Sequence, residues 1–187
     1  MNCAILPLPE AVHPRSIGVL PCRHRLSPQT KLTRIAALHA LNILDTPREE
    51  RFDRLTRLAR RVFNVPYVTI SMIDTQRQWF KSVQGLTICQ TSRDISFCAH
   101  AILFDDILYV ENALKDKRFS DNPVVVGDPK IRFYAGCSLN VNGFKAGTFC
   151  IFDKKPRPFS AEDHQLLKDL AILAEKELAD SPPIMTT

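Results

Sequence analysis

A hairpin signal in the C-terminal part of the sequence constrains the fold more than any other feature. Residues 132–141 and 145–153 are rich in apolar and aromatic side chains, and Asn142-Gly143 joins them. This dipeptide is typical of the primed two-residue turns that connect antiparallel strands. A further strand is expected at 107–111, with a long polar crossover before residue 132. Because such a crossover can lie over one face of a sheet, residues 93–153 predict an antiparallel sheet that encloses a pocket.

The remaining sequence predicts elements that pack around this unit. Three longer helices and a second hairpin are expected from the spacing of apolar residues, at 32–44, 47–64, 161–179 and 67–83. Thr46 with Glu49, and Ser160 with Asp163, have the spacing of capping boxes at the starts of the second and third of these helices. We interpret 97–104 as a short helix under the sheet, and 86–94 as a polar loop. These elements divide the chain into a Pro-rich flexible arm, one domain and a disordered tail, at residues 1–31, 32–179 and 180–187.

The net charge of +5 belongs mainly to the N-terminal arm. Of the chain's 25 basic and 20 acidic residues, five basic residues and one acidic residue fall within 1–34, so the remainder is nearly neutral. The helix at 47–64 carries a stripe of arginines, but Glu50–Arg54 and Asp53–Arg57 have the spacing of ion pairs on a solvated face. We therefore expect no nucleic-acid partner.

The cysteine pattern and the apolar runs indicate the compartment. No apolar run approaches the roughly 18 residues of a membrane-spanning helix, and the chain does not begin with a secretory signal. Six cysteines occur without a Cys-x-x-Cys motif, which favours reduced thiols over a disulfide framework. We expect a cytoplasmic protein with no membrane association.

Eight segments, in one order along residues 33–179, resemble the GAF domain family. They are RIAALHALNILDTP, FDRLTRLARRVFNVPYVTISMID, RQWFKSVQGL, RDISFCAHAI, VENALKDKRFSDNP, IRFYAGCSL, GTFCIFD and PRPFSAEDHQLLKDLA. The resemblance implies an α+β fold with a central antiparallel sheet of five to six strands. It also implies helices on one face and a short helix plus crossover loops on the other.

The pattern is most similar to sensor domains placed ahead of bacterial histidine kinases and diguanylate cyclases. It implies a non-catalytic sensory or regulatory domain that binds a small molecule or a partner protein and signals through its terminal helices. Such helices often pair, and the broad apolar surface of 32–44 agrees with a homodimer. The chain holds no kinase or cyclase segment, so we expect a separate histidine kinase or cyclase as the output protein.

The predicted pocket lies between the sheet and residues 86–134. Its expected ligand-binding residues are mostly aromatic, which suits a flat organic molecule: Trp79, Phe97, Cys98, His100, Arg118, Phe119, Phe133 and Tyr134. The alternative is that these aromatic residues form an ordinary core. Arg118 could contact an anionic ligand or pair with a neighbour such as Asp116 or Asp121. No cofactor is assigned, and the ligand stays unidentified.

Cys98-Ala99-His100 admits three interpretations. Related photoreceptors attach a bilin to a cysteine that a histidine follows directly, whereas here Ala99 intervenes. A metal site would need two further donors, which the sequence does not supply, so no metal is assigned. The third interpretation is structural, with Cys98 as a small apolar side chain and His100 bonded to a backbone carbonyl.

An enzymatic alternative comes from small GAF proteins that reduce free methionine sulfoxide with cysteines. One thiolate attacks the sulfoxide, and a second cysteine resolves the sulfenic acid as a disulfide. Cys89 and Cys98 have a spacing near that of this enzyme class, and Cys137 follows on a later strand. If the chain were such a reductase, these three cysteines would be its catalytic residues.

The family's cyclic-nucleotide signature is matched only in part. Lys154, Phe159 and Asp163 agree with it, whereas Asp153 and His164 depart from it. We predict an ion pair between Lys154 and Asp163 with a structural role.

Overall fold

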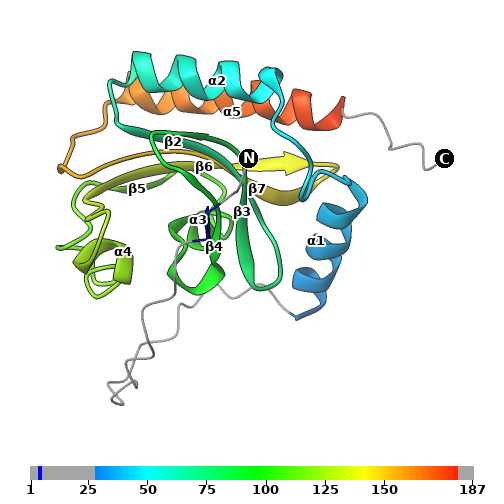
Figure 1. Ribbon diagram of the computed structural model, residues 1–187, viewed down its shortest axis with the longest axis horizontal. Coiled ribbons are helices and arrows are strands. Elements are labelled where there is room, and N and C mark those ends of the chain that lie inside the picture. Colours follow the sequence, from blue (N-terminus) through cyan, green and yellow to red (C-terminus); the bar gives the residue numbers. More distant parts are fainter. Residues whose placement is uncertain (1–3, 6–27, 181–187) are drawn as a thin grey trace.

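Six antiparallel strands form the centre of the protein in the computed structural model, which describes residues 4–5 and 28–180 (Figure 1). The strands are β2 (Tyr67–Ile73), β3 (Arg77–Gln84), β4 (Ile88–Ser92), β5 (Leu108–Val110), β6 (Phe133–Val141) and β7 (Phe144–Asp153). A two-residue strand, β1 (Ala4–Ile5), extends the sheet in parallel beside β4, giving the order β1-β4-β3-β2-β7-β6-β5. The predicted α+β fold with a central antiparallel sheet is confirmed. Most of the predicted arm and tail lies outside the described residues.

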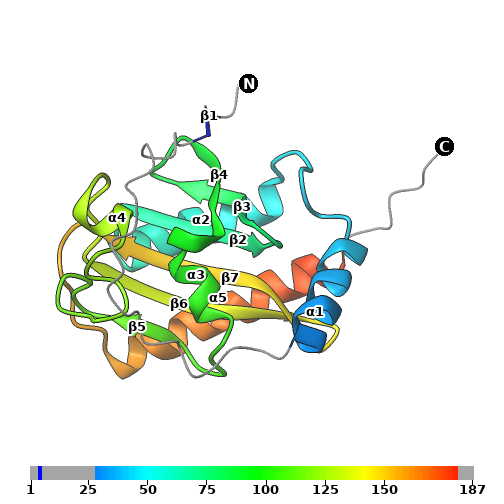
Figure 2. The ribbon, with the colours of Figure 1, turned by 90° about the horizontal axis from the view of Figure 1, so that it is seen from below.

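Helices cover the two faces of the sheet unequally. On one face α2 (Glu50–Val62) and α5 (Ala161–Ala179) lie side by side, and α1 (Pro28–Ala40) stands at one end (Figure 1). On the other face lie α3 (Phe97–Ala101), α4 (Pro123–Val126) and the loops between them (Figure 2). A single turn of 3₁₀ helix, η1 (Arg93–Ile95), leads into α3.

The alternation of side chains along each strand produces two separate apolar cores. On β2, Val68, Ile70 and Met72 join the core under α2 and α5. Tyr67 and Ile73, whose side chains point to the opposite face of the sheet, join the second core, which packs against α3 and the crossover. Because both faces are covered, all seven β2 residues are buried.

The turn between β6 and β7 has the predicted geometry. Asn142 and Gly143 adopt φ of 52° and 81°, and both values fit a primed turn. The register shifts by one residue between Leu139 and Asn140 as the strands approach this turn.

The first helix begins and ends about four residues earlier than predicted. Asn42 and Asp45 adopt positive φ of 48° and 60°, which ends α1 well before the predicted boundary at 44. The predicted capping box of Thr46 and Glu49 is also wrong. The Thr46 hydroxyl donates to the Ile43 carbonyl at 2.7 Å, and no side chain caps α2.

A buried lysine explains why the capping box at the start of α2 does not form, because it contacts both Thr46 and Glu49. Lys81 Nζ on β3 lies 2.6 Å from Glu49 Oε1 and donates to Thr46 Oγ1 and the Pro47 carbonyl at 2.7 Å each. The Lys81 side chain is 0% exposed. The loop before α2 is therefore fastened to the sheet by one charged group.

Two further expectations about local structure are corrected. Residues 86–94 include the strand β4 where a polar loop was predicted, because Thr91 and Gln90 pair with β3. The arginines of α2 pair as Glu50–Arg57 and Arg54–Glu177, and the two predicted pairs with four-residue spacing do not form. Over the described part of the chain, no helix combines the length and apolar character needed to cross a bilayer.

Candidate functional site

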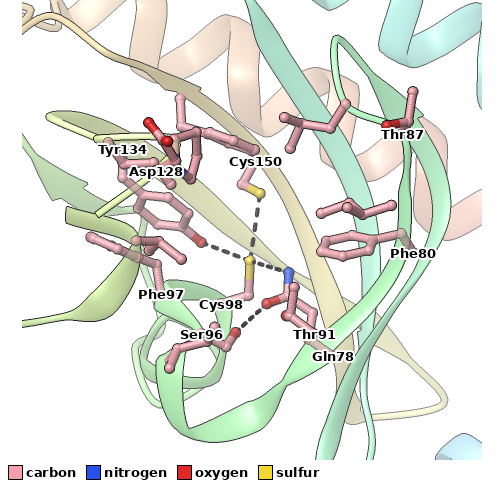
Figure 3. A pocket seen from close by; sticks show the side chains of 17 residues that line it. Gln78, Phe80, Thr87, Thr91, Ser96, Phe97, Cys98, Asp128, Tyr134 and Cys150 are labelled. Carbon is pink, nitrogen blue, oxygen red and sulfur yellow. Dashed lines mark hydrogen bonds between the residues drawn. The ribbon is translucent and has the colours of Figure 1, made fainter. Parts of the chain in front are cut away.

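A cavity of about 250 Å³ lies between the sheet and the segments that carry α3 and α4 (Figure 3). Strands β3, β6 and β7 form its floor, and β4 and the crossover form its walls. It is lined mainly by apolar side chains, with a few amide, hydroxyl and thiol groups: Gln78, Phe80, Leu86, Thr87, Ile88, Thr91, Ile95, Ser96, Phe97, Cys98, Val124, Asp128, Pro129, Ile131, Tyr134, Cys150 and Phe152.

Stacked aromatic rings hold one side of the cavity. The Phe97 ring stacks on Phe119 with 4.1 Å between ring centroids and packs against Tyr134 at 5.1 Å. His100 meets the Phe119 ring edge-on at 5.0 Å. Phe119 is fully buried, so the crossover is anchored to α3 by these rings.

Two thiols face each other in the cavity, one from the strand β7 and one from the helix α3 (Figure 3). Cys98 Sγ on α3 lies 3.5 Å from Cys150 Sγ on β7. Gln78 Nε2 donates to Cys98 Sγ at 3.1 Å, and the Tyr134 hydroxyl donates to it at 3.3 Å. Cys98 is 2% exposed and Cys150 is 1% exposed. We refer to Cys98 and Cys150 as the thiol pair.

Local structure fixes the groups that surround the thiol pair. The Ser96 hydroxyl accepts from the Ala99 N–H at 3.0 Å, which begins α3, and donates to Gln78 Oε1. That contact turns the amide nitrogen of Gln78 toward Cys98. On β6, Gly136 leaves space for the Tyr134 ring, since a Cβ there would lie 2.1 Å from the Tyr134 hydroxyl oxygen.

The two thiols differ in acidity because of this arrangement. Burial opposes ionisation of the Cys98 thiol, but hydrogen bonds led by the one from Cys150 outweigh it and lower its pKa from 9.0 to about 6. Burial and the hydrogen bond to Cys98 raise the pKa of Cys150 well above 9.0. The shared contact between the two sulfurs therefore favours ionisation of Cys98 over ionisation of Cys150.

The structure brings three of the predicted ligand-binding residues to the cavity wall. Phe97, Cys98 and Tyr134 line the cavity. Phe119 and His100 pack behind them, in the ring stack. The Arg118 side chain pairs with Asp116 at 2.6 Å and lies over the Phe119 ring.

Trp79 and Phe133 are placed differently from the expectation. Both belong to the core under α2 and α5, on the opposite face of the sheet. Their strand neighbours, Gln78 and Tyr134, point to the cavity instead, because side chains alternate along a strand. The expectation that Trp79 and Phe133 line the pocket is corrected.

The three cysteines of the reductase alternative do not come together. Cys89 is disulfide-bonded, which corrects the expectation that all thiols are reduced. Cys137 is a free thiol on the helix-covered face of β6, where burial raises its pKa to about 11. Cys98 has Cys150 as its neighbour instead. Sequence reasoning missed Cys150, although Phe149 and Ile151 belong to the helix-covered core and the alternation along β7 turns Cys150 to the opposite face, toward Cys98.

The remaining motif-based expectations are also resolved by the geometry. Asp163 accepts from the Ser160 N–H at 2.9 Å in the predicted capping box, whereas the predicted Lys154–Asp163 ion pair is wrong, because Lys154 Nζ lies over the Tyr67 ring. Within residues 4–5 and 28–180, no three His, Cys, Asp or Glu side chains converge as metal ligands. Burial, with Arg118 nearby, lowers the pKa of His100 below 6.5.

The six-stranded antiparallel sheet, the paired helices on one face and the roofed cavity on the other define an α+β domain of the GAF type. A family model described as "GAF domain" matches residues 47–178. The chain belongs to the GAF domain family.

A longer curated protein contains a segment similar to this chain. The chain is 40% identical over 148 residues to "Cyclic di-GMP phosphodiesterase PA2567" of Pseudomonas aeruginosa, an alignment that covers 78% of this chain and 25% of the relative. The chain thus spans about a quarter of the length of the curated relative it matches.

Solved structures share the fold at low sequence identity. The GAF domain of an Acinetobacter phosphoenolpyruvate-protein phosphotransferase is similar, with a TM-score of 0.56 and 17% identity over 80% of this chain and 92% of that one. The type II free methionine-R-sulfoxide reductase from Thermoplasma acidophilum is similar with a TM-score of 0.57 and 13% identity, over 81% of this chain and 96% of that one. At these identities, the likeness concerns the fold alone.

Proposed function

We propose that this GAF domain is a non-catalytic sensory domain whose cavity binds a small organic molecule. The observation that carries the proposal is the cavity itself, which combines apolar walls with a few convergent polar groups. Ligand binding there would bias the position of α3 and the crossover, and the shared sheet would pass this to α2 and α5.

The lining of the cavity favours a flat, mostly apolar ligand with one hydrogen-bonding edge. Phe80, Phe97 and Phe152 offer ring surfaces. The polar groups gather at one end, where Gln78 and Tyr134 meet the thiol pair. Gln78 and Tyr134 would orient the ligand, while the rings would supply most of its buried contact.

The output of the sensor is proposed from the relative and from the family resemblance. The relative carries the name of a cyclic di-GMP phosphodiesterase, so we propose that this domain regulates a cyclic di-GMP enzyme or a histidine kinase. A cytoplasmic location is part of this proposal.

A second copy of the chain is the proposed partner of the helical layer. Four large apolar side chains are between 45% and 53% exposed there, on two adjacent helices: Leu58, Val62, Ile172 and Leu173. Solvent contact by such a group of apolar side chains is unfavourable, and a matching surface would cover them. The predicted surface at 32–44 contributes less, since Leu38 and Ile43 are buried in the core.

Binding of small aromatic fragments tests the ligand proposal. We expect fragments found by saturation-transfer NMR to bind the reduced protein at one site. The Val124→Trp variant should lose this binding, because Val124 lines the cavity. The matched control is Val126→Trp on the same helix, where the side chain is 60% exposed, and it should bind as the wild type does. Equal binding by the two variants would contradict the proposal.

A thiol-dependent methionine sulfoxide reductase is the second candidate, favoured by the thiol pair. It is tested by incubating the protein with free methionine sulfoxide and a dithiol reductant and measuring methionine. We expect no turnover. Turnover that Cys98→Ser abolishes would replace the sensor proposal with the reductase.

A further inference from the structure

We propose that the thiol pair is a modification site for hydroperoxides, at which Cys98 and Cys150 form a reversible disulfide. The inference uses the cavity of the proposed function but requires no bound ligand. Its test is therefore independent of whether a ligand binds.

The geometry of the pair needs only a small closure. The two sulfurs are 3.5 Å apart, and a disulfide would bring them to about 2.05 Å. Cys150 sits on a central strand that pairs with Thr69 and Gly136 on its two sides, so its backbone is held. Cys98 sits on a helix of five residues followed by a loop. We therefore expect α3 to move toward the sheet.

The surroundings assign different roles to the two cysteines. Cys98 receives hydrogen bonds from Gln78 and Tyr134, which favour its thiolate and make it the attacking sulfur. Cys150 lies beside the Thr69 hydroxyl at 3.0 Å on a central strand, and its sulfur is the one within 3.5 Å of Cys98, which makes it the resolving thiol. Both line the cavity, through which an oxidant as small as hydrogen peroxide can reach them.

The chemistry balances with the hydroperoxide as the two-electron oxidant. The Cys98 thiolate attacks one peroxide oxygen and breaks the O–O bond, which gives Cys98 sulfenic acid and hydroxide. The Cys150 sulfur then attacks the sulfenic sulfur and displaces its hydroxyl group. The Cys150 proton leaves with this group as water, and the S–S bond forms. A dithiol reductant reverses the modification.

The disulfide would also change the cavity. Its formation removes the anionic sulfur to which Gln78 and Tyr134 donate. Phe97 precedes Cys98 and stacks on Phe119, so movement of α3 is carried into the crossover. Oxidation would therefore alter the same segments that a ligand contacts.

Peptide mapping of the full chain tests the proposal directly. The protein is treated with hydrogen peroxide, blocked with iodoacetamide and cleaved after Lys and Arg without reduction. Cys98, Cys137 and Cys150 then lie on separate peptides, at 94–115, 133–145 and 146–154. We expect 94–115 linked to 146–154, with the link lost after dithiothreitol. Cys98 should be oxidised at least ~10-fold faster than Cys137.

Two variants make the result specific. Cys150→Ser should hold Cys98 as a sulfenic acid that dimedone traps, whereas Cys137→Ser should form the link as the wild type does. The wild-type map is decisive even if Cys150→Ser does not fold. The proposal is overturned if peroxide leaves the two peptides unlinked, links Cys98 to a different cysteine, or oxidises Cys137 as fast as Cys98.

Discussion

The acidity of Cys98 depends on a few side chains that no local sequence pattern brings together. Gln78, Tyr134 and Cys150 come from three strands, and each reaches Cys98 through the alternation of its strand. The sequence indicated Cys98 and Tyr134 as site residues, because both lie in apolar segments next to the crossover. It did not indicate Gln78 or Cys150, because their contacts depend on which strands are neighbours in the sheet.

The thiolate should make stability depend on pH. The pKa of Cys98 is lowered from 9.0 to about 6 in the folded state, so between these values the folded state binds fewer protons than the unfolded chain, and stability rises with pH. This contribution is complete above pH 9 and is lost as pH falls through 6. Denaturant unfolding of wild type and Cys98→Ser from pH 6 to 9 checks this.

Comparing wild type with Cys98→Ser isolates the contribution of Cys98 to the pH dependence of stability. His100 has a lowered pKa, so its effect ends near pH 6.5 and is common to wild type and variant. Cys137→Ser is the control, because a pKa of about 11 keeps that thiol protonated across the window. A wild-type slope equal to that of Cys98→Ser would show that Cys98 is a neutral thiol.

Removal of Lys81 should destabilise the protein, because its ammonium group joins the loop before α2 to the sheet. Lys81→Met leaves the Pro47 carbonyl and Thr46 hydroxyl without their donor, and we expect a loss of about 1–3 kcal/mol in the free energy of unfolding. Arg57→Gln, which removes a pair on the exposed face of α2, should change stability little. Thermal and urea unfolding measure both, and equal effects would contradict the role given to Lys81.

Among the elements, β6 controls both the width of the cavity and the position of the Tyr134 hydroxyl. Gly136→Ala places a Cβ 2.1 Å from that hydroxyl oxygen, so the ring must move away from Cys98. We expect several-fold slower peroxide oxidation of Cys98 and a loss of stability of about 1–3 kcal/mol. Tyr134→Phe should slow oxidation with a smaller loss of stability. An unchanged rate of Cys98 oxidation in both variants would contradict the role given to the Tyr134 hydroxyl.

The type of most helices and strands was predictable from the sequence, whereas the contacts between elements that are distant in the sequence were not. The hairpin at Asn142-Gly143, the strand β2 and the capping box of α5 all follow from local signals, and all three are confirmed. The capping box at Thr46 and Glu49 failed because Lys81, distant in sequence, takes both groups. Strand β4 was missed because its polar side chains resemble a loop until β3 supplies its partner.

For the molecule as a whole, the helical layer is the proposed contact with a second copy. Replacing Leu58 and Ile172 together by glutamate puts a charge among the exposed apolar side chains of each helix, and we expect the dimer to dissociate to monomers. Light scattering after size exclusion measures the mass. Leu114→Glu, in a loop away from this layer, is the matched control and should stay dimeric. A monomeric wild type would contradict this part of the proposal.

The fold supports two distinct functions of the sheet, one on each face. Its apolar face carries α2 and α5, and its mixed face carries the cavity and the thiol pair. A ligand or an oxidant on one side would therefore be reported to a partner on the other through the strands that both faces share. This separation is the physical basis of the sensor proposal.

Native mass spectrometry of the protein purified from its own source tests the central claim most directly. We predict a dimer in which each chain carries one small molecule, released on denaturation, and in which Val124→Trp carries none. A protein that is always monomeric and empty, with Val124→Trp indistinguishable from wild type, would contradict the account.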